Sequence, residues 1–395
     1  MVVGEDFLGN GGTKAAHSCG IQTAWTEAPD PSTAVAEVAD AIDRSHVAQL
    51  LIFFSPDYDV AELTAALEAA FGGIAIAGCS TSGGITPDGW IEQGLVLIAF
   101  PLKGFRISST CLEDIGHLDV ASAASSVRTL RRALDHSSAN RRGQRFAISL
   151  IDALTNVEET VVSTIAWALD GIPLVGGSAG DALTFRDTVM IYNGTVLRNA
   201  AILLLVETDF QTKLFKTDNF EPTKTKFVVT GACDRTRTIH ELNAEPAASE
   251  YATAVGLDPK QLSPMSFASH PLTVKIDGEY FCRSIRHLNT DGSLTFFCAV
   301  DEGMVLTLAQ PRDIVDATRE ELDRVEAALG ELDVIIGFDC ILRRLDAEAR
   351  QVRKEISALY RRYNVVGFET YGEQYRSMHL NQTFTGIAIG QATPL

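Results

Sequence analysis

Basic residues are scarce in this chain. Lysine and arginine together number 33, against 51 aspartates and glutamates, which gives the 395 residues a formal net charge of −18. A charge of this sign and size repels the phosphate backbone of nucleic acids and anionic membrane surfaces. We therefore expect neither nucleic acid nor a membrane as the main partner, and we favour a small molecule or another protein.

Long apolar runs and paired cysteines are also missing. No run approaches the roughly 18 apolar residues that a membrane helix needs, and residues 1–20 lack the basic and apolar regions of a signal peptide. The seven cysteines are scattered, odd in number and without a C-x-x-C pair, so they indicate neither a disulfide framework nor a structural zinc site. We expect a cytoplasmic protein with reduced, mostly buried thiols.

The common nucleotide, zinc and haem motifs are absent as well. The chain has no G-x-x-x-x-G-K-[ST] loop, no dinucleotide fingerprint, no H-E-x-x-H and no C-x-x-C-H. These absences argue against a P-loop enzyme, a zincin and covalently attached haem. A non-covalent haem needs only one axial histidine and leaves no spacing signature, so it remains open.

What the chain does contain is a unit that occurs three times. Each copy reads as a strand, a helix, a strand that ends in a glycine-rich loop, and a hairpin; the loops are 78–83, 176–181 and 367–373. Because each loop follows the carboxyl end of a predicted parallel strand, it marks the place where an open α/β sheet holds a ligand. A nucleotide is disfavoured, because each loop runs into a hairpin and not into a helix whose N-terminus would meet phosphates.

The hydrophobic pattern changes period between the second and third copies. There the sequence alternates like antiparallel β structure, interrupted by one helix at about 247–255. The predicted fold class is α/β, in which repeated strand-helix-strand-hairpin modules form mixed sheets, with a β-rich antiparallel insertion in the C-terminal half. We place one domain at 30–208 and a second at 209–395, the second divided into a β-rich part, 209–309, and an α/β return, 310–395.

The glycine-rich loops carry groups suited to a small polar or anionic ligand. These are the backbone N–H groups around Gly78 and the hydroxyls of Ser80, Thr81 and Ser178. The competing interpretation is structural: the glycines allow tight turns and close strand packing, while the hydroxyls cap the chain.

Catalytic signatures are weak. Ser80 is not in a G-x-S-x-G elbow, and Cys340 would be a nucleophile only if a neighbour stabilised its thiolate. We expect no enzymatic activity, and a hydrolase that uses Cys340 or Ser80 is the minor alternative.

Four segments resemble a known family. Ala77–Ile85 resembles the hallmark of the FIST N-terminal domain, and Arg283–Ile285, Asp291–Phe296 and His379–Gly386 resemble its C-terminal partner. The likeness extends over about 48–390. FIST proteins are sensory input modules of bacterial signal transduction, so the resemblance implies small-ligand binding and action through other signalling proteins instead of catalysis.

A subgroup of that family is more similar still. Ser269–Leu272, with the strands that follow it, resembles the stand-alone nitric-oxide-sensing haemoproteins. The resemblance implies haem b with His270 as the iron ligand, His379 and His240 being the next candidates, and a distal site for nitric oxide. It also implies a partner histidine kinase or cyclic-dinucleotide enzyme.

Three further residues complete the expected ligand pocket: Arg283, Glu373 and Asn381. The alternative to haem is a metal-free sensor of a small polar ligand such as an amino acid, bound by the loop hydroxyls. A homodimer is the assembly that we consider beside a monomer.

Overall fold

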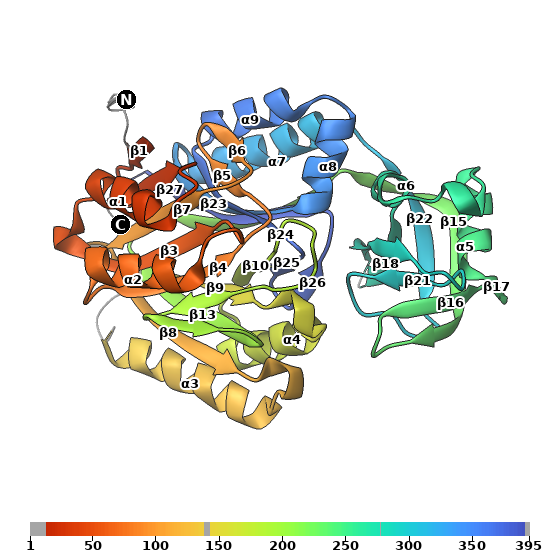
Figure 1. Cartoon of the computed structure of the whole chain (residues 1–395), viewed down its shortest axis with the longest axis horizontal. Coiled ribbons are helices and arrows are strands. Elements are labelled where there is room, and N and C mark those ends of the chain that lie inside the picture. The colour runs from red at the N-terminus through yellow and green to blue at the C-terminus, as the bar shows by residue number, and fades with distance from the viewer. Residues whose placement is uncertain (1–12, 138–142, 277, 392–395) are drawn as a thin grey trace.

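The protein consists of an α/β body and a smaller β-rich domain that stands beside it (Figure 1). The structure, a computed structural model, describes residues 13–137, 143–276 and 278–391. The chain leaves the body after β14 (Thr212–Asp218), forms the β-rich domain, and re-enters the body at α7 (Ile314–Leu329). The predicted fold class is confirmed: α/β modules form mixed sheets, and an antiparallel β-rich unit is inserted in the C-terminal half.

The body is built from three modules with the same order of elements: an edge strand, a helix, a strand, a second helix, a strand, a hairpin and a returning strand. The third module differs in one respect, because two helices stand at the place of the second helix. After β1 (Thr13–Ala16), the first module comprises β2 (Gln22–Thr26), α1 (Pro31–Ala41), β3 (Val47–Phe54), α2 (Val60–Phe71), β4 (Ala75–Ser80), β5 (Gly84–Thr86), β6 (Gly89–Ile91) and β7 (Leu95–Pro101). The second comprises β8 (Phe105–Glu113), α3 (Val120–Ser137), β9 (Gln144–Ile151), α4 (Glu158–Leu169), β10 (Leu174–Ser178), β11 (Met190–Tyr192), β12 (Thr195–Leu197) and β13 (Ala200–Thr208). The third comprises β14, α7, β23 (Leu332–Cys340), α8 (Ile341–Ala349), α9 (Arg353–Arg362), β24 (Val365–Thr370), β25 (Glu373–Tyr375), β26 (Met378–Leu380) and β27 (Thr383–Gly390).

Aspartates begin the equivalent first helices of the three modules. The side chains of Asp30, Asp119 and Asp313 accept hydrogen bonds from backbone N–H groups in the first turns of α1, α3 and α7. An aspartate at this position satisfies N–H groups that have no partner within the helix. The three-fold repetition therefore extends to the local signals that start the helices.

The hairpin of each module pairs with the sheet of a different module. Hairpin β5–β6 joins β24, hairpin β11–β12 joins β4, and hairpin β25–β26 joins β10. Each sheet thus contains four strands of one module and the hairpin of another, in the same spatial order every time. The exchange is cyclic, so the three sheets are linked in a ring.

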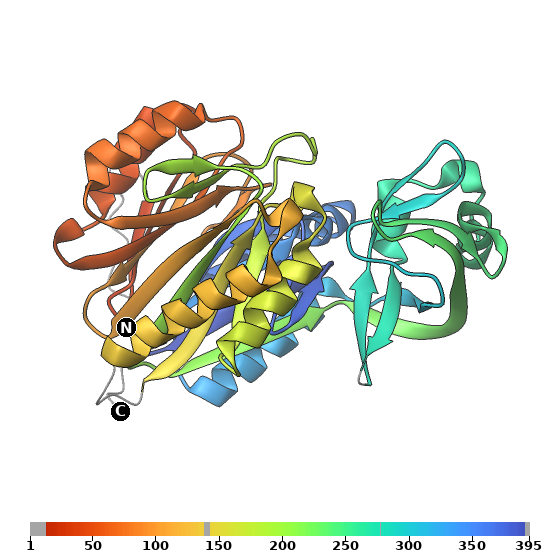
Figure 2. The same ribbon diagram turned by 90° about the horizontal axis from the view of Figure 1, so that it is seen from below.

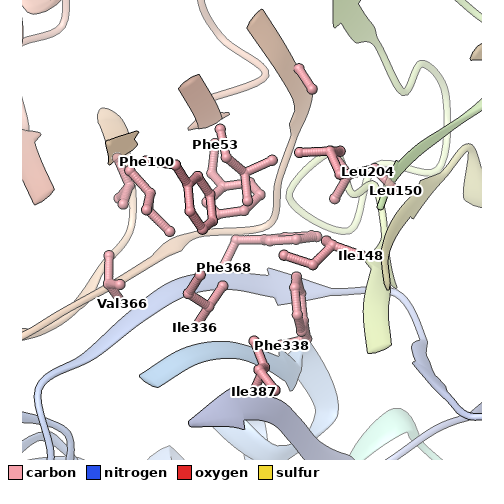
Figure 3. Close-up of a cluster of buried hydrophobic side chains, with 14 of the residues drawn as sticks. Phe53, Phe100, Ile148, Leu150, Leu204, Ile336, Phe338, Val366, Phe368 and Ile387 are labelled. Atoms are coloured by element: carbon pink, nitrogen blue, oxygen red, sulfur yellow. The ribbon is translucent and has the colours of Figure 1, made fainter. Parts of the chain in front are cut away.

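One hydrophobic core lies where the inner faces of the three sheets meet. Phe53, Ile148, Phe338 and Phe368 come from all three sheets and converge there (Figure 3). The Phe368 ring centroid lies 4.4 Å from that of Phe53 and 5.6 Å from that of Phe338. Helices cover the outer faces (Figure 2), so strands such as β3 are buried on both sides. This burial explains the continuous apolar runs in the sequence.

The β-rich domain has its own core and two connections to the body. It contains β15 (Phe220–Cys233), β16 (Thr238–Leu242), β17 (Glu245–Pro246), α5 (Ala247–Val255), α6 (Pro264–Ser269), β18 (Leu272–Ile276), β19 (Glu279–Arg283), β20 (Ile285–Leu288), β21 (Leu294–Phe296) and β22 (Val305–Pro311). Phe220 pairs with Pro311, so the two connections are adjacent. The helix predicted at about 247–255 is present, whereas α6 was not predicted.

Two further findings bear on the sequence-based expectations. Strand β14 pairs with β27 in the body, although alternation alone groups it with the β-rich residues that follow. All seven cysteines are free thiols, and five of them are buried, as expected. No helix in the described part of the chain is long and apolar enough to cross a membrane.

Candidate functional site

The three glycine-rich loops are the points where the chain crosses from one sheet to another. Gly78, Gly176 and Gly367 occupy equivalent positions in β4, β10 and β24. A Cβ atom at any of the three would overlap the backbone oxygen of the neighbouring parallel strand, for example that of Ile52 or Gly337. Close strand packing is therefore what requires glycine here.

The hydroxyls of these loops already have partners inside the protein. Ser80 donates to the carbonyl oxygen of Gly180 at 2.9 Å, and Ser178 accepts from the side chain of Gln374 at 2.9 Å. Thr81 is also buried. The structure places the four loop residues that we expected in the pocket, Gly78 included, in the frame of the body, and none of them lines the two cavities described next.

An open cleft of about 310 Å³ lies between the body and the β-rich domain. Helix α4 and hairpin β25–β26 form the side of the body that faces the β-rich domain (Figure 1), and β19 contributes from the other side. The lining residues are Glu159, Thr160, Ser163, Arg283, Ser377, Met378 and His379. Arg283, which we expected in the ligand pocket, and His379, a candidate iron ligand, thus come together from different domains.

Arg283 is a buried cation that lines the cleft. It is the last residue of β19, and only 6% of it is exposed. One terminal nitrogen donates to the carbonyl oxygen of Cys282 at 3.1 Å, and Nε has no hydrogen-bond partner in the part of the chain that the structure describes. Among the described residues, no carboxylate lies within ion-pair distance of the guanidinium. Because an unpaired buried charge is unfavourable, an anion bound from solution would stabilise this guanidinium.

His379 is the second buried polar group of the cleft that lacks partners. It lies on β26 and is 2% exposed, and neither ring nitrogen forms a hydrogen bond with the described residues. Its Nε2 atom is 4.0 Å from Oε1 of Glu158. Burial lowers the pKa of His379 below its ordinary value, in spite of the nearby carboxylates, so the ring is neutral at neutral pH. Gly372 packs against the ring, and a Cβ atom there would overlap it.

A buried ion cluster lies next to this histidine. Arg237, from the β-rich domain, places one terminal nitrogen 2.6 Å from a carboxylate oxygen of Glu158 and 2.6 Å from one of Glu159. The other oxygen of Glu159 accepts from the backbone N–H of Ala299 at 2.7 Å. The two acids of the N-terminal turn of α4 are thus both bonded across the domain boundary.

Asn381 and Glu373 lie behind the cleft and do not line it. Asn381 donates to the carbonyl oxygen of Tyr371 at 3.2 Å, while its Oδ1 atom has no hydrogen-bond partner among the described residues. Glu373 is fully buried and accepts from the hydroxyls of Thr370 and Thr383. Burial raises the pKa of Glu373 to about 8, in spite of these hydrogen bonds.

A second, much smaller cavity lies near the same interface. The guanidinium of Arg286 lies 4.1 Å from the ring centroid of Phe185. That ring also contacts Tyr371 and Phe297, with centroids 4.7 Å and 5.9 Å away. About 10 Å³ remains, close to the space that one water molecule needs. The aromatic contacts therefore close this part of the interface.

The other two histidines that we expected as iron ligands lie elsewhere. His270 ends α6, half-buried, with Nδ1 3.4 Å from the carbonyl oxygen of Ser266. His240 is exposed on β16. Neither lines a described cavity. Within the described ranges, no group of three or more His, Cys, Asp or Glu side chains is arranged to hold a metal ion.

The hydrolase alternative gains no support. Cys340 is buried, and burial raises the pKa of its thiol far above the usual value. A thiol in that environment stays protonated and is a poor nucleophile. Ser80 has its hydroxyl engaged in the frame of the body.

Comparison with known families gives two matches, which together extend over most of the chain. Residues 49–245 match the FIST N domain and residues 247–376 match the FIST C domain. This chain is a FIST-domain protein. An uncharacterized protein of Methanocaldococcus jannaschii is 23% identical over 352 residues, which cover 78% of this chain and 67% of that protein. FIST domains are associated with small-ligand sensing in signalling proteins, and the cleft takes α4 from the FIST N match and Arg283 from the FIST C match.

Sequence reasoning missed the ion cluster. Glu158 and Glu159 resemble the acids that commonly stabilise the first turn of a helix, and Arg237 lies in a turn that has no recognisable motif. Only the packing of two domains brings these three residues together. A pair of adjacent acids beside a buried arginine from another domain has no spacing signature that a single sequence shows.

Proposed function

We propose that this FIST protein senses a small polar ligand in the cleft between its body and its β-rich domain. One observation carries the proposal: Arg283 and His379, which line the cleft from different domains, are both buried, and both have polar atoms without partners among the described residues. Buried polar groups in native proteins are nearly always hydrogen-bonded, so such a pair is typical of a ligand site.

A ligand held by both walls would link the two domains. It would favour the relative position in which both walls reach it, and so shift an equilibrium between domain arrangements. That is the action a sensory module needs, because a partner can distinguish the two arrangements. The association of FIST domains with small-ligand sensing supports the same proposal.

A thermal-shift screen of small polar metabolites tests this function. A ligand that binds only the folded protein raises the melting temperature by mass action. We expect the shift to disappear in Arg283→Gln and to persist in Arg235→Gln, which removes the same charge at an exposed position of the same domain. The proposal fails if no compound stabilises the protein, or if Arg283→Gln responds like the unaltered chain.

Haem b with nitric oxide as its ligand is the second candidate function. The observation in its favour is His379, whose two ring nitrogens have no hydrogen-bond partner among the described residues. The size of the cleft argues against a haem, because its volume of about 310 Å³ is at the lower end for ligand pockets.

An absorption spectrum decides between the two candidates. Protein purified from cells supplied with iron and haem precursor, or reconstituted with haemin, would show a Soret band that shifts when nitric oxide is added. Loss of the band in His379→Ala and not in His270→Ala would identify His379 as the iron ligand. A protein without such a band under both conditions is not a haem sensor.

We also propose that the output passes to a histidine kinase or a cyclic-dinucleotide enzyme, in agreement with the sensory role of FIST domains. Kinase autophosphorylation or cyclic-dinucleotide turnover, measured with and without the ligand, tests this step. Cytoplasmic location and a homodimer remain predictions, which cell fractionation and light scattering would check.

A further inference from the structure

The charged side chains around His379 sum to zero, but one of them has no partner of opposite charge among the described residues. Two carboxylates, Glu158 and Glu159, and two guanidinium groups, Arg237 and Arg283, surround the neutral ring. Arg237 forms ion pairs with both carboxylates, each at 2.6 Å, and neither carboxylate pairs with Arg283. The site is therefore neutral as a whole, while its β19 wall carries an unpaired positive charge.

We infer that the cleft binds a small monoanion, a carboxylate or a similar oxyanion, on Arg283, and that one proton enters with it onto His379. This inference deepens the proposed function and rests on it. An anion on Arg283 alone would leave the site with one excess negative charge. Protonation of His379 restores neutrality, and both of its ring nitrogens are free to donate, one toward the ligand and one toward Glu158.

A cationic or zwitterionic ligand suits the site less well. The carboxylates of Glu158 and Glu159 are already bonded to Arg237, and Glu159 accepts from Ala299 as well. An ammonium group would therefore have to displace Arg237 from a buried cluster. The cleft offers a free cation to a ligand, and it offers no comparably free carboxylate.

The groups that face His379 set the direction of its pH response. Glu158 and Glu159 act from α4, and Arg237 and Arg283 act from the β-rich domain. On the neighbouring strand, Glu373 is bonded to threonine hydroxyls. Burial lowers the pKa of His379 in the free protein, and a bound anion raises it. At a pH between the pKa of His379 in the free protein and its pKa in the complex, binding of the anion takes up a proton. In that range the affinity for the anion falls about tenfold for each unit by which the pH rises.

Acetate and its neutral isostere acetamide test the charge of the ligand, with propionate and propionamide as a larger pair. We expect the acids, and not the amides, to raise the melting temperature and to move one histidine ring resonance in the NMR spectrum toward its protonated position. His379→Gln assigns that resonance. Arg283→Gln is expected to abolish both effects and Arg235→Gln to leave them intact. The comparison of acid with amide in the unaltered chain needs no variant, so it stands even if Arg283→Gln fails to fold.

Calorimetry in two cationic buffers of different ionisation enthalpy counts the protons. We expect uptake approaching one proton for each acetate bound in the unaltered chain, and none in His379→Gln. Acetate binding without proton uptake overturns the histidine part of the inference. A neutral polar compound that binds through Arg283 where acetate does not overturns the anion part and leaves the proposed function intact. If neither anionic nor neutral polar compounds bind, both this inference and the proposed function fail.

Discussion

Arg237 of the β-rich domain and Glu158 of the body form an ion pair of 2.6 Å across the domain boundary, with 3% of each side chain exposed. Because the two residues belong to different domains, their pairing helps to fix how the two walls of the cleft face each other. The pair is buried, so it responds to the loss of one partner much more strongly than a surface pair does.

Arg237→Gln is expected to loosen the contact between the domains. An unpaired buried charge costs about 3–5 kcal/mol, and both Glu158 and Glu159 lose their cationic partner in this variant, although Glu159 keeps its bond from the N–H of Ala299. Each domain has its own core, so we expect the cost to appear as undocking and not as global unfolding. Hydrogen exchange at the N-terminal turn of α4 and a larger radius of gyration in X-ray scattering would reveal it. Unchanged exchange there, with Arg235→Gln as the matched control, would show that the ion pair does not hold the domains.

Glu373 is expected to make the protein less stable at alkaline pH. The pKa of this carboxyl is raised by burial to about 8 in the folded protein, against 4.5 as the ordinary value. The folded state therefore binds the proton more tightly than the unfolded chain does. This contribution to stability is complete below pH 4.5 and is lost as the pH rises through about 8, and its full size is on the order of 5 kcal/mol.

Urea denaturation between pH 6 and pH 9 measures this effect. Glu373→Gln resembles the protonated carboxyl and keeps an oxygen for Thr383. We expect its stability to vary less over this range than that of the unaltered chain. Two parallel curves would mean that Glu373 does not titrate in the folded protein.

Gly367→Ala is expected to prevent the third module from folding normally. The new Cβ atom would overlap the backbone oxygen of Gly337 on the paired strand, and a backbone clash cannot be relieved by rotating a side chain. We expect a loss of more than about 4 kcal/mol, or insoluble protein. Gly171→Ala is the control: its φ is +88° and nothing lies near the new atom, so it should cost only about 1–2 kcal/mol. Similar soluble yields and urea midpoints for the two variants would contradict the packing argument.

Arg343→Met is expected to destabilise the body severely. The guanidinium is 1% exposed and bonds Asp339 at 2.7 Å, Thr318 at 2.8 Å and Asn219 at 3.1 Å. Its removal takes the cationic partner from the buried carboxyl of Asp339 and one hydrogen bond each from Thr318 and Asn219, so we expect a loss of about 3–5 kcal/mol in urea denaturation.

The matched variant for that network is Arg319→Met. Arg319 pairs with Asp316 at 2.5 Å, and 43% and 63% of the two side chains are exposed. An exposed pair contributes about 0–1 kcal/mol. Equal losses in the two variants would show that burial of the Arg343 network adds nothing.

Local structure could be predicted from the sequence, whereas strand partners could not. The apolar run of β3, the cap at Asp30 and the helix Ala247–Val255 all follow from residues close in sequence. The hairpin exchange does not, because β5 alternates in the same way whether it pairs within its module or with β24. Helix α8 was missed because it follows β23 without a loop.

The same distinction holds for the candidate site. Arg283 and His379 were named from a family resemblance, and the structure brings both to one cleft. The loop hydroxyls at Ser80 and Ser178 were named for their chemistry, and their partners lie in segments distant in sequence. A hydroxyl in a glycine-rich loop looks the same in a sequence whether it faces a ligand or a neighbouring strand. Contacts between distant segments decide the role, and a single sequence does not show them.

The cyclic exchange of hairpins sets a condition on how this protein is made in the cell. Gly84 pairs with Phe368, so the ribosome must complete nearly the whole third module before the first hairpin has a partner. At ~5–20 residues per second, that wait is on the order of half a minute. During it the nascent chain exposes unpaired strand edges, which invite aggregation. A message truncated before β24 would therefore yield a product for the quality-control machinery, and not a smaller working sensor.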